Sequence, residues 1–168
     1  MLASRVVACL AAALLLGTAS SALAEEEKGA FGLGLLVGEP TAVSAKLYLT
    51  DDQAIAGAVG GAVMRRGIQV HADYLFHPWI LETTDTFVLP AYVGPGLRIL
   101  SHDRGSGLDD AFHIGPRATV GLLFDFRTVP LDVFVETAGI LEYRASSDDD
   151  HRGVGIDINA GAGVRYYF

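Results

Sequence analysis

Three residues have the types needed for hydrolysis by a serine nucleophile. Ser44 carries a hydroxyl group, and His71 and Asp73 stand two residues apart, which places both on one face of an extended strand. A histidine oriented by a carboxylate can activate a serine for attack on a carbonyl group. Whether the three side chains could meet depends on the elements that carry them.

Two acidic runs could bind a cation. Asp148–Asp150 precede His151, and Asp109–Asp110 occupy another polar stretch. Calcium prefers several carboxylate oxygens, but the spacing matches no calcium-binding loop, and runs of like charge in exposed loops are usually only solvated. We therefore expect no cofactor and no resident metal, and keep weak binding of a divalent cation by these loops as a hypothesis.

Eight segments alternate apolar side chains with small or polar ones, which is the pattern of strands with two different faces. The predicted strands are Phe31–Val37, Thr41–Leu49, Ala54–Met64, Ile68–Phe76, Phe87–Ser101, Ala111–Asp125, Leu131–Tyr143 and Val154–Phe168. No helix is predicted after residue 24. The expected fold is an all-β, eight-stranded antiparallel up-and-down barrel in which the last strand pairs with the first. An even number of strands would place both termini at one end.

Three stretches depart from clean alternation. Gly57, Gly60 and Gly61 leave the two faces of the third strand nearly indistinguishable. Pro90 and Pro95 each remove a backbone donor, so we predict bulges or pairing gaps beside them. The segment His77–Thr86 is predicted to be a connection, with Trp79 at an interface.

Met1–Ala24 has the features of a cleavable secretory signal. Arg5 supplies the positive charge, Val6–Leu16 the apolar run, and Ala22–Ala24 the small residues of a cleavage site. Residues 25–168 then form a single domain. Cys9, the only cysteine, lies in the apolar run, so no disulfide is expected; lipidation of Cys9 is the alternative.

Charge and hydropathy restrict the class of partner. The chain has a net charge of −8, which argues against nucleic acid as a ligand. Hydrophobic residues make up 51% of the chain, yet no segment offers the roughly 20 consecutive apolar residues of a transmembrane helix. Apolar residues dispersed over alternating strands are typical of a barrel wall between lipid and a polar interior.

The parity of the strands predicts which charged residues face the interior. Four are basic and four are acidic: Lys46, Asp73, Arg98, Arg117, Asp132, Glu136, Asp157 and Arg165. Asp125 and Glu142 also face inward but are expected nearer the rims. An eight-stranded barrel is just wide enough for side chains to fill it. We therefore expect a polar network of ion pairs, with Arg117–Glu136 at its centre and Arg98 joining from strand 87–101. A small ion pathway is the alternative.

The final strand carries a further signal. Val164, Tyr166 and Phe168 alternate along it up to a terminal aromatic residue. Together with the exported N-terminus and the eight strands, this ending resembles small bacterial outer-membrane β-barrels of the OmpA transmembrane domain, OmpX and OmpW type. The resemblance implies location in the outer membrane of a Gram-negative cell, contact with outer-membrane lipid, and recognition of the three residues by the barrel-insertion machinery. It also implies a structural or surface-interaction role in the cell envelope.

Two other functional classes are alternatives to this role. A soluble exported barrel resembling lipocalins would turn the apolar face inward around a small apolar ligand. A lipid A-modifying enzyme, by resemblance to an outer-membrane deacylase, would need a closely spaced His and Ser at the lipid-facing surface. Parity instead directs Ser44, His71 and Asp73 inward, so the prediction is that the protein is not an enzyme.

Overall fold

The computed structural model describes residues 28–62, 67–102, 111–145 and 153–168. The predicted signal Met1–Ala24, which includes Cys9, lies outside these residues, as do the acidic runs Asp109–Asp110 and Asp148–Asp150. Every described element is a β-strand. The predictions for the signal and for cation binding by the loops therefore stay predictions.

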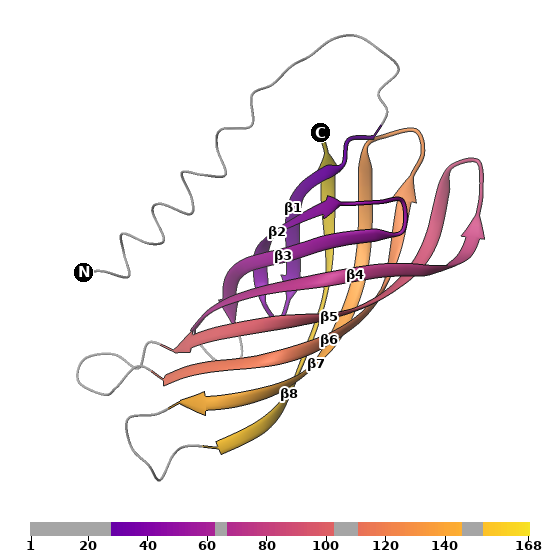
Figure 1. Ribbon diagram of the computed structural model, residues 1–168. Coiled ribbons are helices and arrows are strands. Elements are labelled where there is room, and N and C mark those ends of the chain that lie inside the picture. The colour runs from indigo at the N-terminus through magenta and orange to yellow at the C-terminus, as the bar shows by residue number, and fades with distance from the viewer. Residues whose placement is uncertain (1–27, 63–66, 103–110, 146–152) are drawn as a thin grey trace.

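Eight strands follow one another along the chain (Figure 1). They are β1 Phe31–Gly38, β2 Thr41–Tyr48, β3 Gln53–Ala62, β4 Gly67–Thr83, β5 Phe87–His102, β6 Ala111–Phe126, β7 Leu131–Ala145 and β8 Gly153–Tyr167. Each strand pairs antiparallel with its neighbours in sequence, and β1 pairs with β8, so the sheet is a closed barrel. The predicted all-β architecture and the closure between first and last strand are confirmed.

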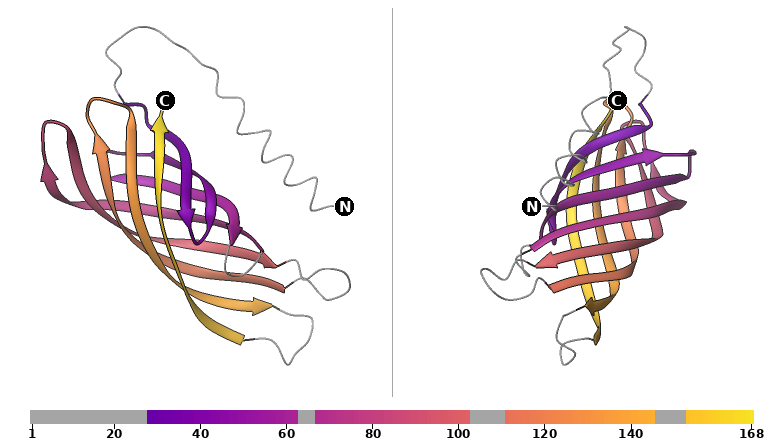
Figure 2. Two further views of the ribbon diagram at one scale, coloured as in Figure 1. Left: turned by 180° about the vertical axis from the view of Figure 1, so that it is seen from behind. Right: turned by 60° about the vertical axis from the view of Figure 1, so that its left-hand side comes forward.

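The strands are strongly tilted against the barrel axis (Figure 2). Following paired residues once around the ring from Asp157 leads back to β8 at Tyr167, far along the same strand. The residues on this path are Ile140, Arg117, Gly96, Asp73, Ala56, Lys46 and Gly32. Such a displacement is how a sheet closes with tilted strands. The tilt also brings side chains of non-neighbouring strands to a common level inside.

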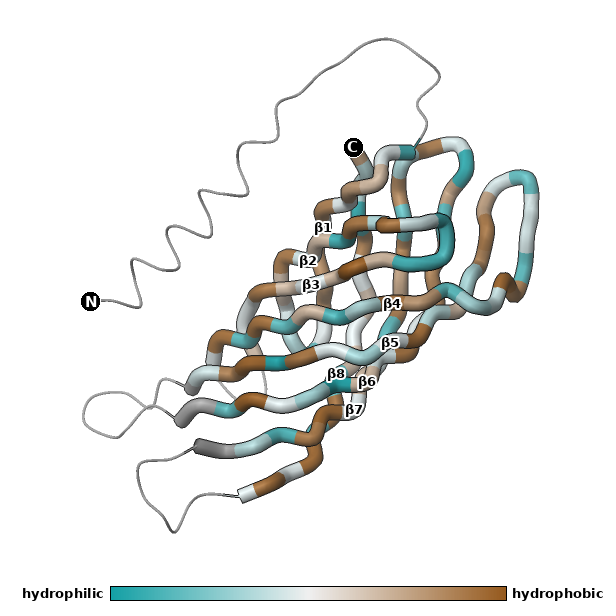
Figure 3. Tube along the Cα trace, in the orientation of Figure 1, coloured by the Kyte–Doolittle hydropathy of each residue, from teal (hydrophilic) through white to brown (hydrophobic). Residues whose placement is uncertain are grey.

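Alternation along the strands separates the two faces of the wall (Figure 3). Inward positions are mostly buried, and outward positions carry exposed apolar side chains on every strand. One example from each strand in turn is Leu35, Val43, Ile55, Val70, Leu97, Val120, Val135 and Ile158. The period-2 pattern predicted these faces, because successive side chains of a strand point to opposite sides.

The faces of β3 are decided by its neighbours. Ala56 pairs with Lys46 on β2 and with Asp73 on β4, both of which face inward. Ala56 is accordingly buried, while Ile55 and Val59 are exposed on the outside. A strand of small residues thus takes its orientation from the register of the partners on either side.

The prediction of a connection at His77–Thr86 was wrong for most of its length. β4 continues to Thr83, and only residues 84–86 form the turn. β5 supplies partners as far as Thr83–Val88, with register shifts between Phe76 and Trp79 and between Ile80 and Glu82. These shifts destroy the two-residue period, so the sequence gives no strand signal there.

The prediction of pairing gaps at the two prolines of β5 is confirmed. The β4–β5 ladder is interrupted at Gly94–Pro95, and the β5–β6 ladder is interrupted at Leu89–Pro90. Each proline keeps a partner on its other side, Ile80 for Pro90 and Ala118 for Pro95. The wall therefore stays closed despite two missing backbone donors.

Both ends of the described chain lie at one end of the barrel (Figure 1). The backbone N–H of Phe168 donates to the carbonyl oxygen of Phe31 at 2.9 Å. The turns at residues 49–52, 84–86 and 127–130 lie at this end, which we call the terminal end. The strands β1, β3, β5 and β7 therefore end at the opposite end of the barrel.

Candidate functional site: the polar interior of the barrel

The eight charged residues predicted to face the interior come from six of the eight strands. Six are buried: Lys46, Asp73, Arg98, Arg117, Asp132 and Arg165. Glu136 and Asp157 are half-buried. Burying a charge is costly unless it is paired and hydrogen-bonded, so the partners of each group decide what the interior can do.

The central cluster is built on Arg117. Its Nε atom lies 2.8 Å from Asp73 Oδ1, and its Nη2 atom lies 3.3 Å from Glu136 Oε1. Thr119 accepts from Arg117 Nε at 3.0 Å and donates to Asp73 at 3.3 Å, and the Tyr92 hydroxyl donates to Glu136 at 3.1 Å. The expected pair of Arg117 with Glu136 is present. Asp73 joins it from β4, which is not a neighbour of β6.

The second cluster surrounds Arg98 and differs from the prediction. Its Nη1 atom donates to Asp157 and to Asn159, both at 2.7 Å, and its Nη2 atom pairs with Glu142. Arg98 thus reaches across the lumen to β7 and β8 and does not join the Arg117–Glu136 pair. Its backbone pairs with Gly115, two positions from Arg117 on β6, so it lies at a different level of the barrel.

The third cluster lies towards the terminal end. The Tyr167 hydroxyl donates to Asp132 at 2.5 Å, and Arg165 Nη1 lies 3.8 Å from the same carboxylate. Arg165 Nε donates to Ser44 at 3.1 Å, and the guanidinium stacks 3.6 Å from the centre of the Phe134 ring. Aromatic stacking and hydrogen bonding together hold this buried cation in one orientation.

Lys46 is held by neutral groups. Its Nζ atom lies 2.9 Å from the Tyr48 hydroxyl and 2.9 Å from His77 Nε2, and it sits 4.3 Å from the centre of the Tyr48 ring. His77 Nδ1 lies 3.1 Å from the carbonyl oxygen of Asp52. A carbonyl only accepts, so His77 carries its proton on Nδ1 and accepts from Lys46 through Nε2.

An apolar cluster fills the lumen alongside the charged groups. Its large members are Leu36, Leu75, Tyr92, Leu123 and Phe134, with Ala42, Ala56 and Ala58 beside them. Phe134 and Leu123 are fully buried. Two glycines leave room for two of these rings. A Cβ at Gly121 would lie 2.3 Å from the Tyr92 ring, and a Cβ at Gly163 would lie 2.4 Å from the Phe134 ring. Large side chains thus occupy the space that glycines leave on the neighbouring, paired strands.

The residues with the types of a hydrolytic triad have separate partners. Ser44 accepts from Arg165, Asp73 pairs with Arg117, and His71 lies 3.5 Å from Gln69. All three are buried inside the barrel. The structure therefore does not assemble a serine, a histidine and a carboxylate in hydrogen-bonding order.

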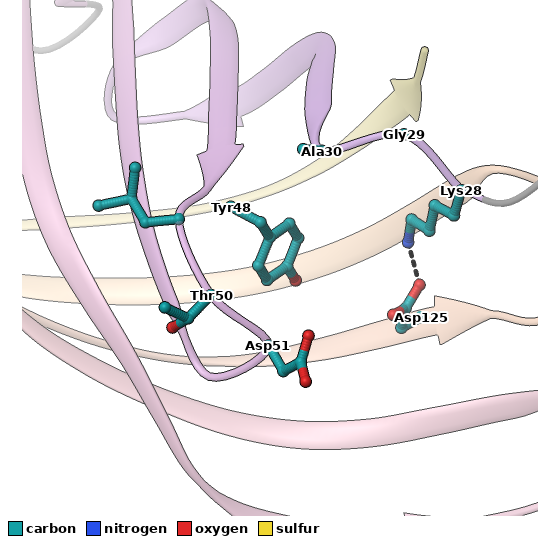
Figure 4. A pocket seen from close by; sticks show the side chains of 8 residues that line it. Lys28, Gly29, Ala30, Tyr48, Thr50, Asp51 and Asp125 are labelled. Carbon is teal, nitrogen blue, oxygen red and sulfur yellow. Dashed lines mark hydrogen bonds and ion pairs between the residues drawn. The ribbon is translucent and has the colours of Figure 1, made fainter.

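A pocket of about 420 Å³ opens at the terminal end, between the first described residues and the turn after β2 (Figure 4). It is lined by Lys28, Gly29, Ala30, Tyr48, Leu49, Thr50, Asp51 and Asp125. Lys28 pairs with Asp125 and lies 4.2 Å from the centre of the Tyr167 ring. Lys28 and Asp125, two of the three charged residues that line this pocket, thus already bind each other.

Among the described residues, no group of three or more His, Cys, Asp or Glu side chains is arranged to hold a metal ion. No helix in the described part of the chain is long and apolar enough to cross a membrane.

Several interior partners were not among the predicted site residues: Glu142, Asn159, His77, Tyr92 and Tyr167. Alternation along the predicted strands placed all of them on the inward face except His77, which was predicted to lie in the connection after Phe76.

Comparison of the chain with protein-family models, with curated proteins and with solved structures gave no match. The geometry of the barrel is therefore the basis for the function proposed below.

Proposed function

We propose that the protein is a small integral outer-membrane β-barrel with a structural or surface-interaction role in the cell envelope. The observation that carries this proposal is the distribution of side chains across the wall. Exposed apolar side chains occur on the outside of all eight strands, while paired charges are buried within. Soluble monomers rarely expose an apolar patch of more than about 600 Å². Lipid around the barrel would cover this surface.

The alternative of a soluble lipocalin-like barrel expects the opposite arrangement, with an apolar lumen around a ligand. Here Arg98 and Arg117 are almost completely buried in the lumen, and aliphatic side chains such as Val120 and Ile158 are outside. The closed ring also supports a lipid environment, because hydrogen bonds between strands satisfy the backbone groups that a bilayer cannot.

The interior supports a filled barrel in preference to an open pore. Three charged clusters and a set of buried aromatic and aliphatic side chains occupy the same lumen. The buried guanidinium groups of Arg98, Arg117 and Arg165 each have carboxylate, amide or hydroxyl partners, which is expected of a packed interior and not of a water-filled conduit. The role we propose for the network is to hold the barrel together.

Insertion would use the outer face of β8 and the residue that follows it. Val164, Tyr166 and Phe168 point outward, and the rings of Tyr166 and Phe168 lie 5.1 Å apart in an edge-on contact. An exposed apolar stripe of this kind offers the barrel-insertion machinery a surface to recognise. We propose these three residues as the assembly signal.

Fractionation of cells expressing the protein tests the proposal. We expect the protein in the outer-membrane fraction, resistant to extraction with high salt or carbonate and released by detergent. Recovery in the periplasmic fraction, soluble without detergent, would defeat the proposal and favour the soluble barrel.

A further inference from the structure

The β4–β5 hairpin continues past the level at which β1, β2 and β3 end. β3 pairs with β4 only as far as Gln53–Phe76, and the last contact on that side is the His77 N–H with the Asp52 carbonyl oxygen at 2.8 Å. Beyond it β4 pairs with β5 alone, as far as Thr83–Val88. Figure 2 shows the hairpin standing clear of β1–β3 at the terminal end.

The side chains of this extension are apolar and exposed. Trp79 is 56% exposed, Ile80 66% and Leu81 55%. Trp79 pairs with Ala91 and Phe76 with Val93, so Trp79 continues the outer face from Phe76, which is 40% exposed. Ile80 pairs with Pro90 and lies on the other side of the hairpin, which is exposed there too. Two further rings lie at this end of the hairpin, Phe87 on β5 and Phe124 on the neighbouring β6, with centres 5.8 Å apart. The apolar surface of the wall therefore runs without a break onto the hairpin.

Polarity changes abruptly at the tip of the hairpin (Figure 3). Glu82, Thr83, Asp85 and Thr86 are all exposed, directly after the apolar run. The tip is held in place, because the Arg127 N–H donates to the carbonyl oxygen of Thr86 at 3.0 Å. A tryptophan between an apolar stem and a polar tip is the arrangement found where a protein crosses the boundary between acyl chains and headgroups.

The free edge of β4 is poorly suited to binding a protein strand. Pro78 lacks a backbone donor, and the two register shifts around Trp79 and Ile80 distort the row of hydrogen-bonding groups. Edges with a proline and bulges are those that sheets protect against added strands. The exposed face is thus suited to a fluid apolar partner.

We propose that the β4–β5 hairpin is a lipid anchor, with Trp79, Ile80 and Leu81 at the headgroup–acyl boundary of the leaflet on the terminal side. This inference rests on the proposed function and deepens it. The barrel would contact lipid further towards the terminal side at β4–β5 than at β1–β3. The hairpin then fixes how deeply the barrel sits in the bilayer.

The protein contains one tryptophan, so the fluorescence of Trp79 reports on the hairpin directly. The purified protein is folded into phosphatidylcholine vesicles whose lipids carry bromine either near the headgroup end or near the methyl end of the acyl chains. We expect Trp79 emission at shorter wavelength than in the unfolded chain, with at least twofold stronger quenching by the shallow bromines. Quenching by aqueous acrylamide as strong as in the unfolded chain, with no effect of bromine, would overturn the anchor and indicate a hairpin in water.

A matched control separates this test from the proposed function. The variant Trp79→Phe with Val120→Trp moves the reporter to the outer face of β6, where Val120 is 52% exposed. Stronger quenching of this control by the deep bromines, with Trp79 unquenched, would reject the anchor and leave the membrane proposal standing. If neither tryptophan is quenched by bromine, the membrane proposal itself fails. Should the Val120→Trp variant not fold, Leu97→Trp in the same background serves, since Leu97 is also exposed on the outside.

Discussion

At the scale of single residues, the barrel is organised by buried groups with several partners each. A guanidinium presents five N–H donors in a planar fork, so one arginine can bind acceptors from different strands. Arg117 binds carboxylates from β4 and β7, and Arg98 binds acceptors from β7 and β8. The contacts of Arg117 with β4 and of Arg98 with β7 and β8 join strands that share no backbone hydrogen bonds. The interior therefore adds to the closure that the ladders provide.

Replacement of Arg117 by alanine tests the central cluster. Arg117→Ala leaves Asp73 and Glu136 without their cation, and removing one partner of a buried pair costs about 3–5 kcal/mol. We expect a loss of this size in the free energy of unfolding by urea, measured in detergent micelles or vesicles. Arg127→Ala, in the exposed turn after β6, is the matched control and should change stability by no more than about 0.5 kcal/mol. Equal small effects of the two variants would contradict a central role for Arg117.

Two adjacent tyrosines provide a second test at the residue scale. Tyr167→Phe removes the hydroxyl that donates to the fully buried Asp132, and leaving a buried acceptor unpaired costs about 1–3 kcal/mol. Tyr166→Phe removes the same atom from the outer face and should be nearly neutral. Urea unfolding of both variants compares the two sides of the wall. An equal decrease in the free energy of unfolding for the two variants would show that the inward hydroxyl stabilises the barrel no more than the outward one.

At the scale of elements, regular alternation predicted most of the strands, and it failed where alternation is absent. The faces of β7 and β8 could be predicted because the acidic residues of each strand lie on one face, although β7 also directs Phe134 and Ile140 inward. The faces of β3 could not, since alanines and glycines occupy both sides, and only the register with Lys46 and Asp73 decides them. The extension of β4 was missed because its register shifts break the period and both sides of the hairpin are exposed beyond the ring.

Glycine positions on neighbouring strands allow the packing of the lumen to be tested. A Cβ at Gly121 on β6 would lie 2.3 Å from the Tyr92 ring, whereas a Cβ at Gly139 on β7 meets nothing within 4 Å. Overpacking costs about 1–3 kcal/mol, so Gly121→Ala should destabilise the barrel by that amount. Gly139→Ala should be neutral or slightly stabilising, because glycine weakens a strand. Thermal unfolding of the two variants checks the difference, and a neutral Gly121→Ala would mean that Tyr92 has room to move.

The partners of the interior charges illustrate the limit of sequence reasoning for the site. Parity predicts that Arg98 faces inward, because that depends only on its place in the strand. Its partners Glu142 and Asp157 depend on the tilt of the barrel and on the register of four strands, which alternation does not encode. Arg117–Glu136 could be predicted because β6 and β7 are adjacent both in sequence and in the sheet.

At the scale of the whole molecule, the account requires the barrel to be closed to ions. The lumen holds the apolar cluster of Leu36, Leu75, Tyr92, Leu123 and Phe134 together with the paired charges. We expect no steady conductance when the purified protein is added to planar lipid bilayers. The double variant Tyr92→Ala with Phe134→Ala should introduce conductance steps, because it removes two buried rings. Conductance of the unaltered protein that disappears on Arg98→Ala would instead support an ion pathway.

We propose a closed ring of strands whose apolar outer wall is surrounded by lipid. Electrophoresis in SDS with and without boiling, after folding in the presence or absence of lipid vesicles, tests both parts at once. A barrel with an apolar exterior and a buried ion-pair network should fold only with lipid or detergent and then resist SDS until it is boiled. We predict a mobility shift on boiling in the samples folded with vesicles and none in the samples without. A protein that remains soluble and folded without lipid, and shows one mobility before and after boiling, would contradict the account.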